Sequence, residues 1–330
     1  MEYENILEVR NLKIIYRTDD GVVEALNGVN LSIAKGKTLG LVGETGAGKT
    51  TLAKGIMGLI PYPPGEIISG EILYCGEDLL KFTEKRRRKI RGAEISMIFQ
   101  DPMTSLNPVM PVGKQIEEVL KEHGRITNEE AKKGAENMLE IVGIPKDRVD
   151  EYPHQFSGGM KQRIIIAIAL ACKPRLLIAD EPTTALDVTI QHQVLTLMSN
   201  LKREFDTSLL MITHDLGIVA QNCDYVAIMY AGEIVEYGTL HDIFKNYKHP
   251  YTEGLFGSIP SLTEDVERLT PIEGQVPDPT KLPKGCKFHP RCKYVQEACM
   301  SWDSEMYNIS SEHQVRCILY NPERKSIAED

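Results

Sequence analysis

Long apolar segments are missing from this sequence of 330 residues. The longest uninterrupted apolar run, Ile164 to Cys172, has nine residues, whereas a helix that spans a membrane needs about 20. The first residues include Glu2, Glu4 and Glu8, so they lack the basic segment and the apolar segment of a secretory signal. We therefore expect a soluble chain that acts at a membrane only through partners.

The sequence also lacks an excess of positive charge and an even number of cysteines. The formal net charge is −9, which argues against a general nucleic-acid binder, since such proteins are usually basic. The seven cysteines are an odd number, and without a secretory signal they do not indicate a disulfide framework. Cys75, Cys172 and Cys223 are scattered along the chain, and we expect each to be a small buried apolar residue.

The hydrophobic pattern predicts an α/β fold. Two alternating segments, 6–16 and 22–33, are typical of paired strands joined by a turn at residues 19–21. Further along, short apolar strands alternate with amphipathic helices, which predicts a mainly parallel sheet covered on both faces. The expected strands are 38–42, 176–179, 209–213, 225–230 and 233–237, and the expected helices are one beginning at Lys49, 115–122, 129–142 and 188–205.

Two segments differ from this alternating pattern. Residues 101–171 are mostly helical in character, which predicts a helical subdomain inserted into the α/β core. After about Tyr247 the chain becomes rich in proline, which indicates an extended tail. Its prolines include Pro271, Pro277, Pro279, Pro283 and Pro290.

A glycine-rich loop follows the strand predicted at 38–42. Residues 43–50 read Gly-Glu-Thr-Gly-Ala-Gly-Lys-Thr, which fits the phosphate-loop pattern G-x-x-x-x-G-K-[ST]. Glycines let backbone N–H groups turn inward around a polyphosphate, and the following helix adds partial positive charge. We expect Lys49 to reach the β- and γ-phosphates of ATP and Thr50 to ligate Mg²⁺. The expected nucleotide contacts here are Gly43, Glu44, Thr45, Gly46, Ala47, Gly48, Lys49, Thr50 and Thr51.

Polar side chains follow several of the buried strands. Asp180 and Glu181 end one strand, and such a position faces the crevice where open α/β sheets bind ligands. Asp180 suits the Mg²⁺ shell, and Glu181 suits the group that orients or deprotonates the attacking water. His214 and Gln100 follow two further apolar stretches. We expect His214 to contact the γ-phosphate and Gln100 to bind metal or water.

A serine and two glycines precede another predicted helix. Ser157 suits the N-cap of that helix, and Gly158 and Gly159 permit close approach of the backbone. One interpretation is a simple helix cap. The other is a second anion-binding helix end, too far along the chain to belong to the surroundings of the first loop.

Together these residues resemble the nucleotide-binding subunit of ABC transporters over about residues 6–260. Residues 156–160, Phe-Ser-Gly-Gly-Met, are similar to the family signature, usually read LSGGQ, with Phe and Met in place of its outer residues. Gln100 matches the Q-loop, residues 185–187 (Ala-Leu-Asp) match the D-loop, and His214 matches the switch histidine. Tyr16 matches the aromatic residue that stacks on adenine.

The resemblance implies a fold and an assembly. It implies an ABC-type P-loop core over 1–250, with an N-terminal antiparallel β-subdomain and the helical subdomain at about 101–171, followed by a C-terminal extension over 251–330. Two such domains sandwich two ATP molecules, so that Ser157, Gly158, Gly159 and Asp187 complete the partner's site. The implied catalytic residues are Glu181, His214, Lys49 and Gln100, with Mg²⁺ held by Thr50, Gln100 and Asp180.

The resemblance also implies partners and a location. The family pairs two ATPase subunits with two transmembrane permease subunits at the cytoplasmic face of the cell membrane, and we expect a related second ATPase chain, with an identical one as the alternative. The permeases would dock around Gln100 to Pro111. An extracellular peptide-binding protein would act indirectly, and nucleic acid would not be a partner.

The C-terminal part is similar to one branch of this family, the dipeptide and oligopeptide importers. The similar segments are 249–252 (His-Pro-Tyr-Thr), 258–260 (Ser-Ile-Pro), 285–292 (Gly-Cys-Lys-Phe-His-Pro-Arg-Cys) and the spacing of Cys286, Cys292, Cys299 and Cys317. In this branch the four cysteines can hold a [4Fe-4S] cluster. The implied function is the ATP-hydrolysing motor of a peptide importer; import of nickel or another small solute, and an ABC-type ATPase that is not coupled to transport, are the alternatives.

The four clustered cysteines need a chemical explanation of their own. Four thiolates suit tetrahedral zinc as well as a [4Fe-4S] cluster, and free or disulfide-bonded thiols are the remaining possibility. We expect a bound metal to help fold a tail that has little core of its own. A rival hypothesis makes the chain a metal-dependent interaction or redox-sensing module, which the complete set of ATPase residues argues against. The basic run 85–89 (Lys-Arg-Arg-Arg-Lys) fits a solvated surface, with acidic lipid or an acidic partner as the alternative.

Overall fold

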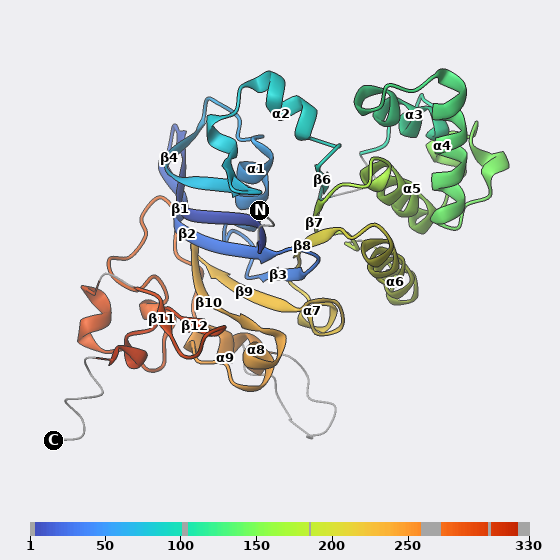
Figure 1. The fold of residues 1–330 in the computed structure, drawn as a ribbon. Coiled ribbons are helices and arrows are strands. Elements are labelled where there is room, and N and C mark those ends of the chain that lie inside the picture. Colours follow the sequence, from blue (N-terminus) through green and yellow to red (C-terminus); the bar gives the residue numbers. More distant parts are fainter. Residues whose placement is uncertain (1–3, 101–104, 185, 259–271, 303–304, 323–330) are drawn as a thin grey trace.

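A long mixed sheet forms the centre of the protein (Figure 1). The computed structural model describes residues 4–100, 105–184, 186–258, 272–302 and 305–322. Within them, the strand order of this sheet is β11-β12-β10-β9-β3-β8-β7-β6, and neighbours from β9 to β6 run parallel. The strands in that order are Tyr307–Asn308, Gln314–Val315, Glu233–Thr239, Tyr225–Tyr230, Thr38–Val42, Ser208–Ile212, Leu176–Asp180 and Ile95–Ile98. The predicted parallel core is therefore confirmed, with antiparallel strands added at one edge.

A second, antiparallel sheet contains the N-terminal hairpin. Its strand order is β2-β1-β4-β5, and its strands are Gly21–Ala34, Asn5–Thr18, Gly65–Tyr74 and Glu77–Asp78. The predicted hairpin turn is confirmed, because Thr18 pairs with Gly21 across residues 19 and 20. Tyr16 lies on β1 opposite Val23 and Gly65.

The central sheet separates two apolar cores because side chains alternate along a strand. On β7, Leu176 and Ile178 pack towards the antiparallel sheet and α1 (Lys49–Met57). Leu177 and Ala179 on the same strand pack into the other core, to which most of the other helices contribute. These parallel strands are buried on both faces, which explains why they read as unbroken apolar runs.

Most helices lie on the side of the sheet away from the hairpin. Between β6 and β7 the described chain forms α3 (Val112–His123), α4 (Asn128–Ile141) and α5 (Gly158–Leu170). The start of α4 is set by a capping box of Thr127 and Glu130. The other helices are α2 (Glu84–Ile90), α6 (Val188–Glu204), α7 (Leu216–Asn222), α8 (Leu240–Lys245) and α9 (Pro250–Gly257), with short 3-10 helices at Leu79–Lys81, Lys146–Arg148, Pro153–Gln155, His289–Arg291, Glu297–Met300 and Ile318–Tyr320. Of the helices described, none has the combined length and apolarity of a membrane-spanning segment.

The C-terminal extension packs into the core of the preceding domain, which the expectation of an extended tail with little core of its own did not include. Phe288 is 3% exposed and packs against Tyr230 and Tyr251, with ring centroids 5.2 and 5.4 Å away. The strand β12 pairs with β10, with Val315 opposite Glu236. The extension therefore folds through aromatic packing and strand addition, which its proline content did not reveal.

Two other sequence expectations need comment. Cys223 is buried as predicted, but Cys75 and Cys172 are only half-buried, since each lies at the margin of a core and not inside it. The predicted features at 101–104, Ala185, Ile259-Pro260 and Pro271 lie outside the described residues.

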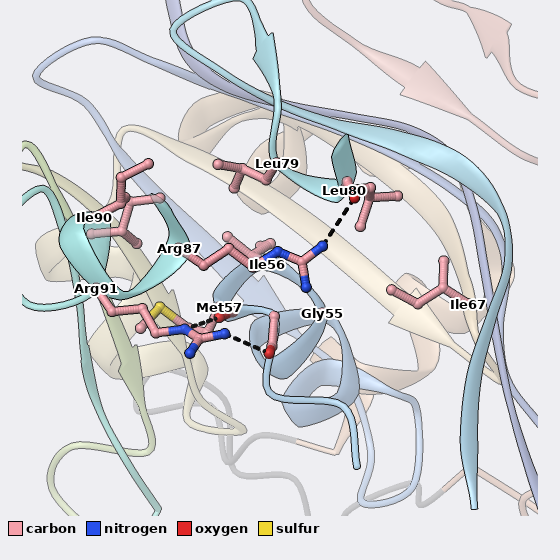
Figure 2. Close-up of a pocket in the computed structure, with 11 residues that line it drawn as sticks. Gly55, Ile56, Met57, Ile67, Leu79, Leu80, Arg87, Ile90 and Arg91 are labelled. Carbon is pink, nitrogen blue, oxygen red and sulfur yellow. Dashed lines mark hydrogen bonds between the residues drawn. The ribbon is translucent and has the colours of Figure 1, made fainter. Parts of the chain in front are cut away.

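Arg91 joins α2 to the end of α1, the helix that follows the phosphate loop (Figure 2). Its Nε donates to the carbonyl of Met57 at 2.8 Å, and its Nη2 donates to the carbonyl of Gly58 at 2.8 Å. Its Nη1 donates to Glu84 at 2.9 Å. One guanidinium group thus satisfies carbonyls that the end of α1 would leave unpaired, and its charge favours the negative end of that helix.

Replacing Arg91 by Leu is expected to lower the free energy of unfolding by about 1–3 kcal/mol, because two helix-end carbonyls lose charged donors. Arg88→Leu is the matched control on the same helix, since the Arg88 side chain is 77% exposed and lies 3.7 Å from Glu84. We expect the control to change stability by no more than about 0.5 kcal/mol. Denaturant unfolding of both variants measures this difference, and equal effects would contradict the role given to Arg91.

Candidate nucleotide site

The phosphate loop runs from the end of β3 to the start of α1, as predicted. Gly46 and Gly48 have φ angles of 85° and 105°, a region that side chains with a Cβ rarely adopt. At Gly48 a Cβ would also lie 2.6 Å from the carbonyl oxygen of Ala25, and at Gly43 it would collide with that of Met229. The glycines are therefore needed for backbone packing as well as for the turn.

Lys49 lies inside this loop and is 7% exposed. Its Nζ donates to the carbonyl of Gly43 at 2.6 Å and to that of Glu44 at 3.0 Å. Burial lowers the pKa of Lys49, against the opposing influence of the Glu181, Asp180 and Glu44 carboxylates. The ammonium group is thus held where an anionic ligand of the loop would meet it.

Asp180, at the end of β7, is a buried carboxylate. The residue is 1% exposed, and among the described residues neither of its carboxylate oxygens has a well-formed hydrogen bond. Burial raises the pKa of Asp180, and the nearby Thr50 hydroxyl and Lys49 lower it by less. An orphaned carboxylate beside a threonine hydroxyl is a donor set that suits Mg²⁺. The site therefore fits the cation that the sequence predicts.

Glu181 is positioned by side chains from two loops. Its Oε1 lies 3.2 Å from Nδ1 of His214, and its Oε2 accepts from the Thr184 hydroxyl at 3.0 Å. Burial raises the pKa of Glu181, but the hydrogen bonds from His214 and Thr184 and the charge of Lys49 lower it overall. Gln100 reaches the same carboxylate with Nε2 at 3.5 Å. The predicted residues Glu181, His214 and Gln100 are thus brought together at the carboxyl ends of β7, β8 and β6.

Other predicted residues lie apart from this group. Ser157 caps α5, with its Oγ accepting from the Met160 N–H at 3.4 Å, and Asp187 caps α6 by accepting from Ile190 at 3.0 Å. Among the described residues, neither side chain is hydrogen bonded to the phosphate loop. The helix-cap interpretation of Ser157 is confirmed, and it does not conflict with a second role.

Three residues of this region were not anticipated from the sequence. The Thr184 hydroxyl donates to Glu181. The two residues are three positions apart, so the sequence could have indicated this contact. Tyr251 and Arg291 contact Glu44 of the phosphate loop from 207 and 247 residues away. No local pattern links such distant positions, so only the tertiary structure could identify them.

The four C-terminal cysteines line one cavity, together with residues such as His249 and Phe288. All four are free thiols in the structure. Burial raises the pKa of Cys286 to about 11 and that of Cys317 to about 12, and the neighbouring thiols add to both shifts. Within the described residues, no three His, Cys, Asp or Glu side chains already stand in a metal-binding arrangement. The thiols are gathered, but their arrangement alone identifies no ion.

The sequence matches two known family models. Residues 26–184 match the ABC transporter family, and residues 235–299 match the C-terminal region of oligopeptide/dipeptide transporters. The chain is 52% identical over 325 residues to the oligopeptide transport ATP-binding protein OppD of Bacillus subtilis (strain 168), covering 98% of this chain and 91% of that protein. It is 48% identical over 318 residues to the dipeptide transport ATP-binding protein DppD of the same organism, covering 96% and 95%.

A solved structure has the same fold over most of this chain. It is the dimeric structure of a post-hydrolysis state of an ATP-binding cassette bound to ADP and Pi, with a TM-score of 0.64 and 27% identity. The match covers 71% of this chain and 98% of that one.

Replacing Asp180 by Asn is expected to raise stability without nucleotide and to weaken Mg²⁺-dependent ATP binding. Since the folded state raises the pKa of Asp180, its ionised form destabilises the fold at neutral pH, and the neutral amide removes that effect. Changes to the groups that only orient metal ligands lower metal affinity by roughly tenfold or more. Loss of a ligand itself should therefore weaken Mg²⁺ binding by at least about tenfold. Thermal unfolding with and without MgATP measures both; a variant that MgATP stabilises as strongly as wild type would contradict the assignment.

Proposed function

Because the chain belongs to the ABC transporter ATP-binding subunits, of the oligopeptide and dipeptide importer type, we propose that it is the ATP-hydrolysing motor that powers uptake of short peptides. The observation that carries this proposal is the grouping of Lys49, Asp180, Glu181 and His214 around one phosphate loop. Uptake of nickel or another small solute is the alternative substrate class, and an ABC-type ATPase without a transport partner is a further, less favoured alternative.

The chain's own residues can carry out γ-phosphate hydrolysis. Lys49 lies where it can bind the β- and γ-phosphates, and the loop amides can surround them. Glu181, kept ionised by its neighbours, can orient a water molecule and accept its proton. His214, whose ring contacts Glu181, would donate to the γ-phosphate. Thr50, Asp180 and Gln100 would hold Mg²⁺, which when bound neutralises part of the phosphate charge.

We assign the signature segment to a partner's ATP. The α5 N-terminus at Ser157, Gly158 and Gly159 provides backbone N–H groups and partial positive charge suited to phosphate. Asp187 is exposed at the start of α6, and the neighbouring Val188 is 82% exposed. These exposed side chains leave the start of α6 accessible to a second subunit. The dimeric cassette among the solved relatives supports this arrangement.

The assembly we propose has two ATPase subunits and two membrane permeases at the cytoplasmic face of the cell membrane. A related second ATPase chain is preferred to an identical one. The permeases would contact the segment from Gln100 to Pro111, which precedes α3 in the sequence. We assign α3, α4 and α5 to the helical subdomain. A peptide-binding protein outside the cell would act through the permeases, and Tyr16 would stack on adenine.

We propose that Cys286, Cys292, Cys299 and Cys317 hold a [4Fe-4S] cluster, with zinc as the alternative. The shared cavity and the four free thiols support this ligand set. Because burial raises the pKa of Cys286, Cys292 and Cys317, the thiols are protonated at neutral pH, and binding would release protons.

Replacing Glu181 by Gln is expected to preserve ATP binding and to lower ATP turnover by about 10²–10⁴-fold, since the amide retains shape but cannot accept the proton. The variant should also trap a closed dimer with ATP. Steady-state ATPase rates and size-exclusion chromatography of the complex with its permeases test this. Near wild-type turnover in the variant would exclude the role given to Glu181.

Purification without oxygen is expected to yield chain with iron and acid-labile sulfide in equal amounts and a visible absorption band. Cys292→Ser should lose the band, because one thiolate ligand is removed. Cys172→Ser, which changes a half-buried thiol elsewhere, should keep it. Zinc without sulfide would favour the alternative metal and exclude the cluster.

A further inference from the structure

Glu44, the second residue of the phosphate loop, is held by an arginine of the C-terminal extension. Arg291 Nη1 donates to Glu44 Oε2 at 2.7 Å, and its Nη2 donates to Oε1 at 3.2 Å. The Arg291 side chain is 5% exposed, and that of Glu44 is 29% exposed. A fork-to-fork ion pair with a buried arginine is both stronger and more directional than an exposed pair.

Arg291 is itself fixed in this position. Its Nε donates to the carbonyl of Glu273 at 3.0 Å, and its Nη2 also donates to that of Ile272 at 3.3 Å. Its Nη1 lies 3.4 Å from the Tyr230 hydroxyl. A long side chain held by these contacts has already lost its rotamer freedom. It can therefore hold the Glu44 carboxylate in one position.

Tyr251 provides a second link to the same residue. The Glu44 N–H donates to the Tyr251 hydroxyl at 3.0 Å. Tyr251 is fully buried, and its ring lies 4.6 Å from that of Tyr230 and 5.4 Å from that of Phe288. The backbone of Glu44 is therefore anchored to an aromatic cluster that the extension completes.

The third polar group of Glu44 leads to the nucleotide site. Its carbonyl accepts from Lys49 Nζ at 3.0 Å. The N–H, carboxylate and carbonyl of Glu44 thus bind Tyr251, Arg291 and Lys49 in turn. This continuous path connects the extension to the lysine that would meet the phosphates.

We propose that Arg291 and Tyr251 are positioning residues for ATP binding, acting on the phosphate loop through Glu44. A glycine-rich loop loses much conformational freedom when it closes around a ligand. Anchors that hold it beforehand remove part of that cost from the binding step. The proposal rests on the proposed nucleotide site and deepens it: the extension becomes a contributor to ATP affinity.

The test uses the full chain, four single variants and the double variant Glu44→Gln/Arg291→Met, with MgATP binding measured by calorimetry. Arg291→Met removes the charge but keeps the apolar stem, and Glu44→Gln removes the charge but keeps the shape. Arg291→Lys keeps the charge without the fork. Lys293→Met is the matched control, because Lys293 pairs with Glu253 on α9 at 2.8 Å and not with the loop. Thermal unfolding without nucleotide accompanies each variant.

Arg291→Met is expected to raise the Kd for MgATP by about tenfold. The KM for ATP should rise in parallel while kcat stays within about twofold, since a positioning contact affects ground-state and transition-state binding alike. Arg291→Lys should recover only part of the affinity, because a point charge cannot reproduce the fork. Lys293→Met should leave Kd unchanged. In the Glu44→Gln background, Arg291→Met should add little further loss, since both act through one contact.

Three outcomes would overturn the proposal: a wild-type Kd in Arg291→Met, equal losses in Arg291→Met and Lys293→Met, or additive losses of Arg291→Met and Glu44→Gln. If Arg291→Met does not fold, Tyr251→Phe replaces it. That variant removes one hydroxyl from the Glu44 N–H, and an unchanged Kd there would be equally decisive. Failure of the wild-type chain to bind MgATP would instead refute the proposed function itself.

Discussion

The electrostatic attraction of a buried ammonium group by three nearby carboxylates is the interaction on which the nucleotide site depends. Lys49 lies within the electrostatic reach of Glu181, Asp180 and Glu44, and burial opposes its charge. Each of these groups would be costly to bury alone, and their mutual attraction offsets part of that cost. The parallel pairing of β3, β8 and β7 brings their carrier loops to one edge of the sheet. Sheet topology and electrostatics therefore act together at this edge.

The C-terminal extension takes part in this arrangement and is not a separate appendage. It adds β12 beside β10, fills one core with Phe288 and supplies Arg291 to the phosphate loop. Cys292 follows Arg291 directly, so the cavity lined by the four cysteines begins next to the residue that holds Glu44. One peptide bond and the Arg291–Glu44 ion pair therefore separate this cavity from the phosphate loop.

The sequence predicted helices and strands correctly where one pattern of apolar residues was clear over the whole segment. The strand at 38–42 and the helix beginning at Lys49 were correct to the residue, because a continuous apolar run ends in a glycine loop of known pattern. Boundaries of the other predicted elements differed by one or a few residues, as for β8, which ends at Ile212 and leaves His214 in the following loop. The strand β4 and the helix α2 were not predicted. The packing of the extension against the domain was not predicted, because proline content reports local chain geometry and carries no information on long-range packing.

The sequence by itself determined the identity of the groups that the site needs: a phosphate loop, a lysine, two adjacent carboxylates and a histidine after a strand. Their spacing is local, and local backbone physics is enough to interpret it. Only the tertiary structure decided that Glu44 meets Tyr251 and Arg291, since these residues are 207 and 247 positions apart. Contacts over such separations depend on how two cores and an added strand pack, and no periodicity along the chain encodes them.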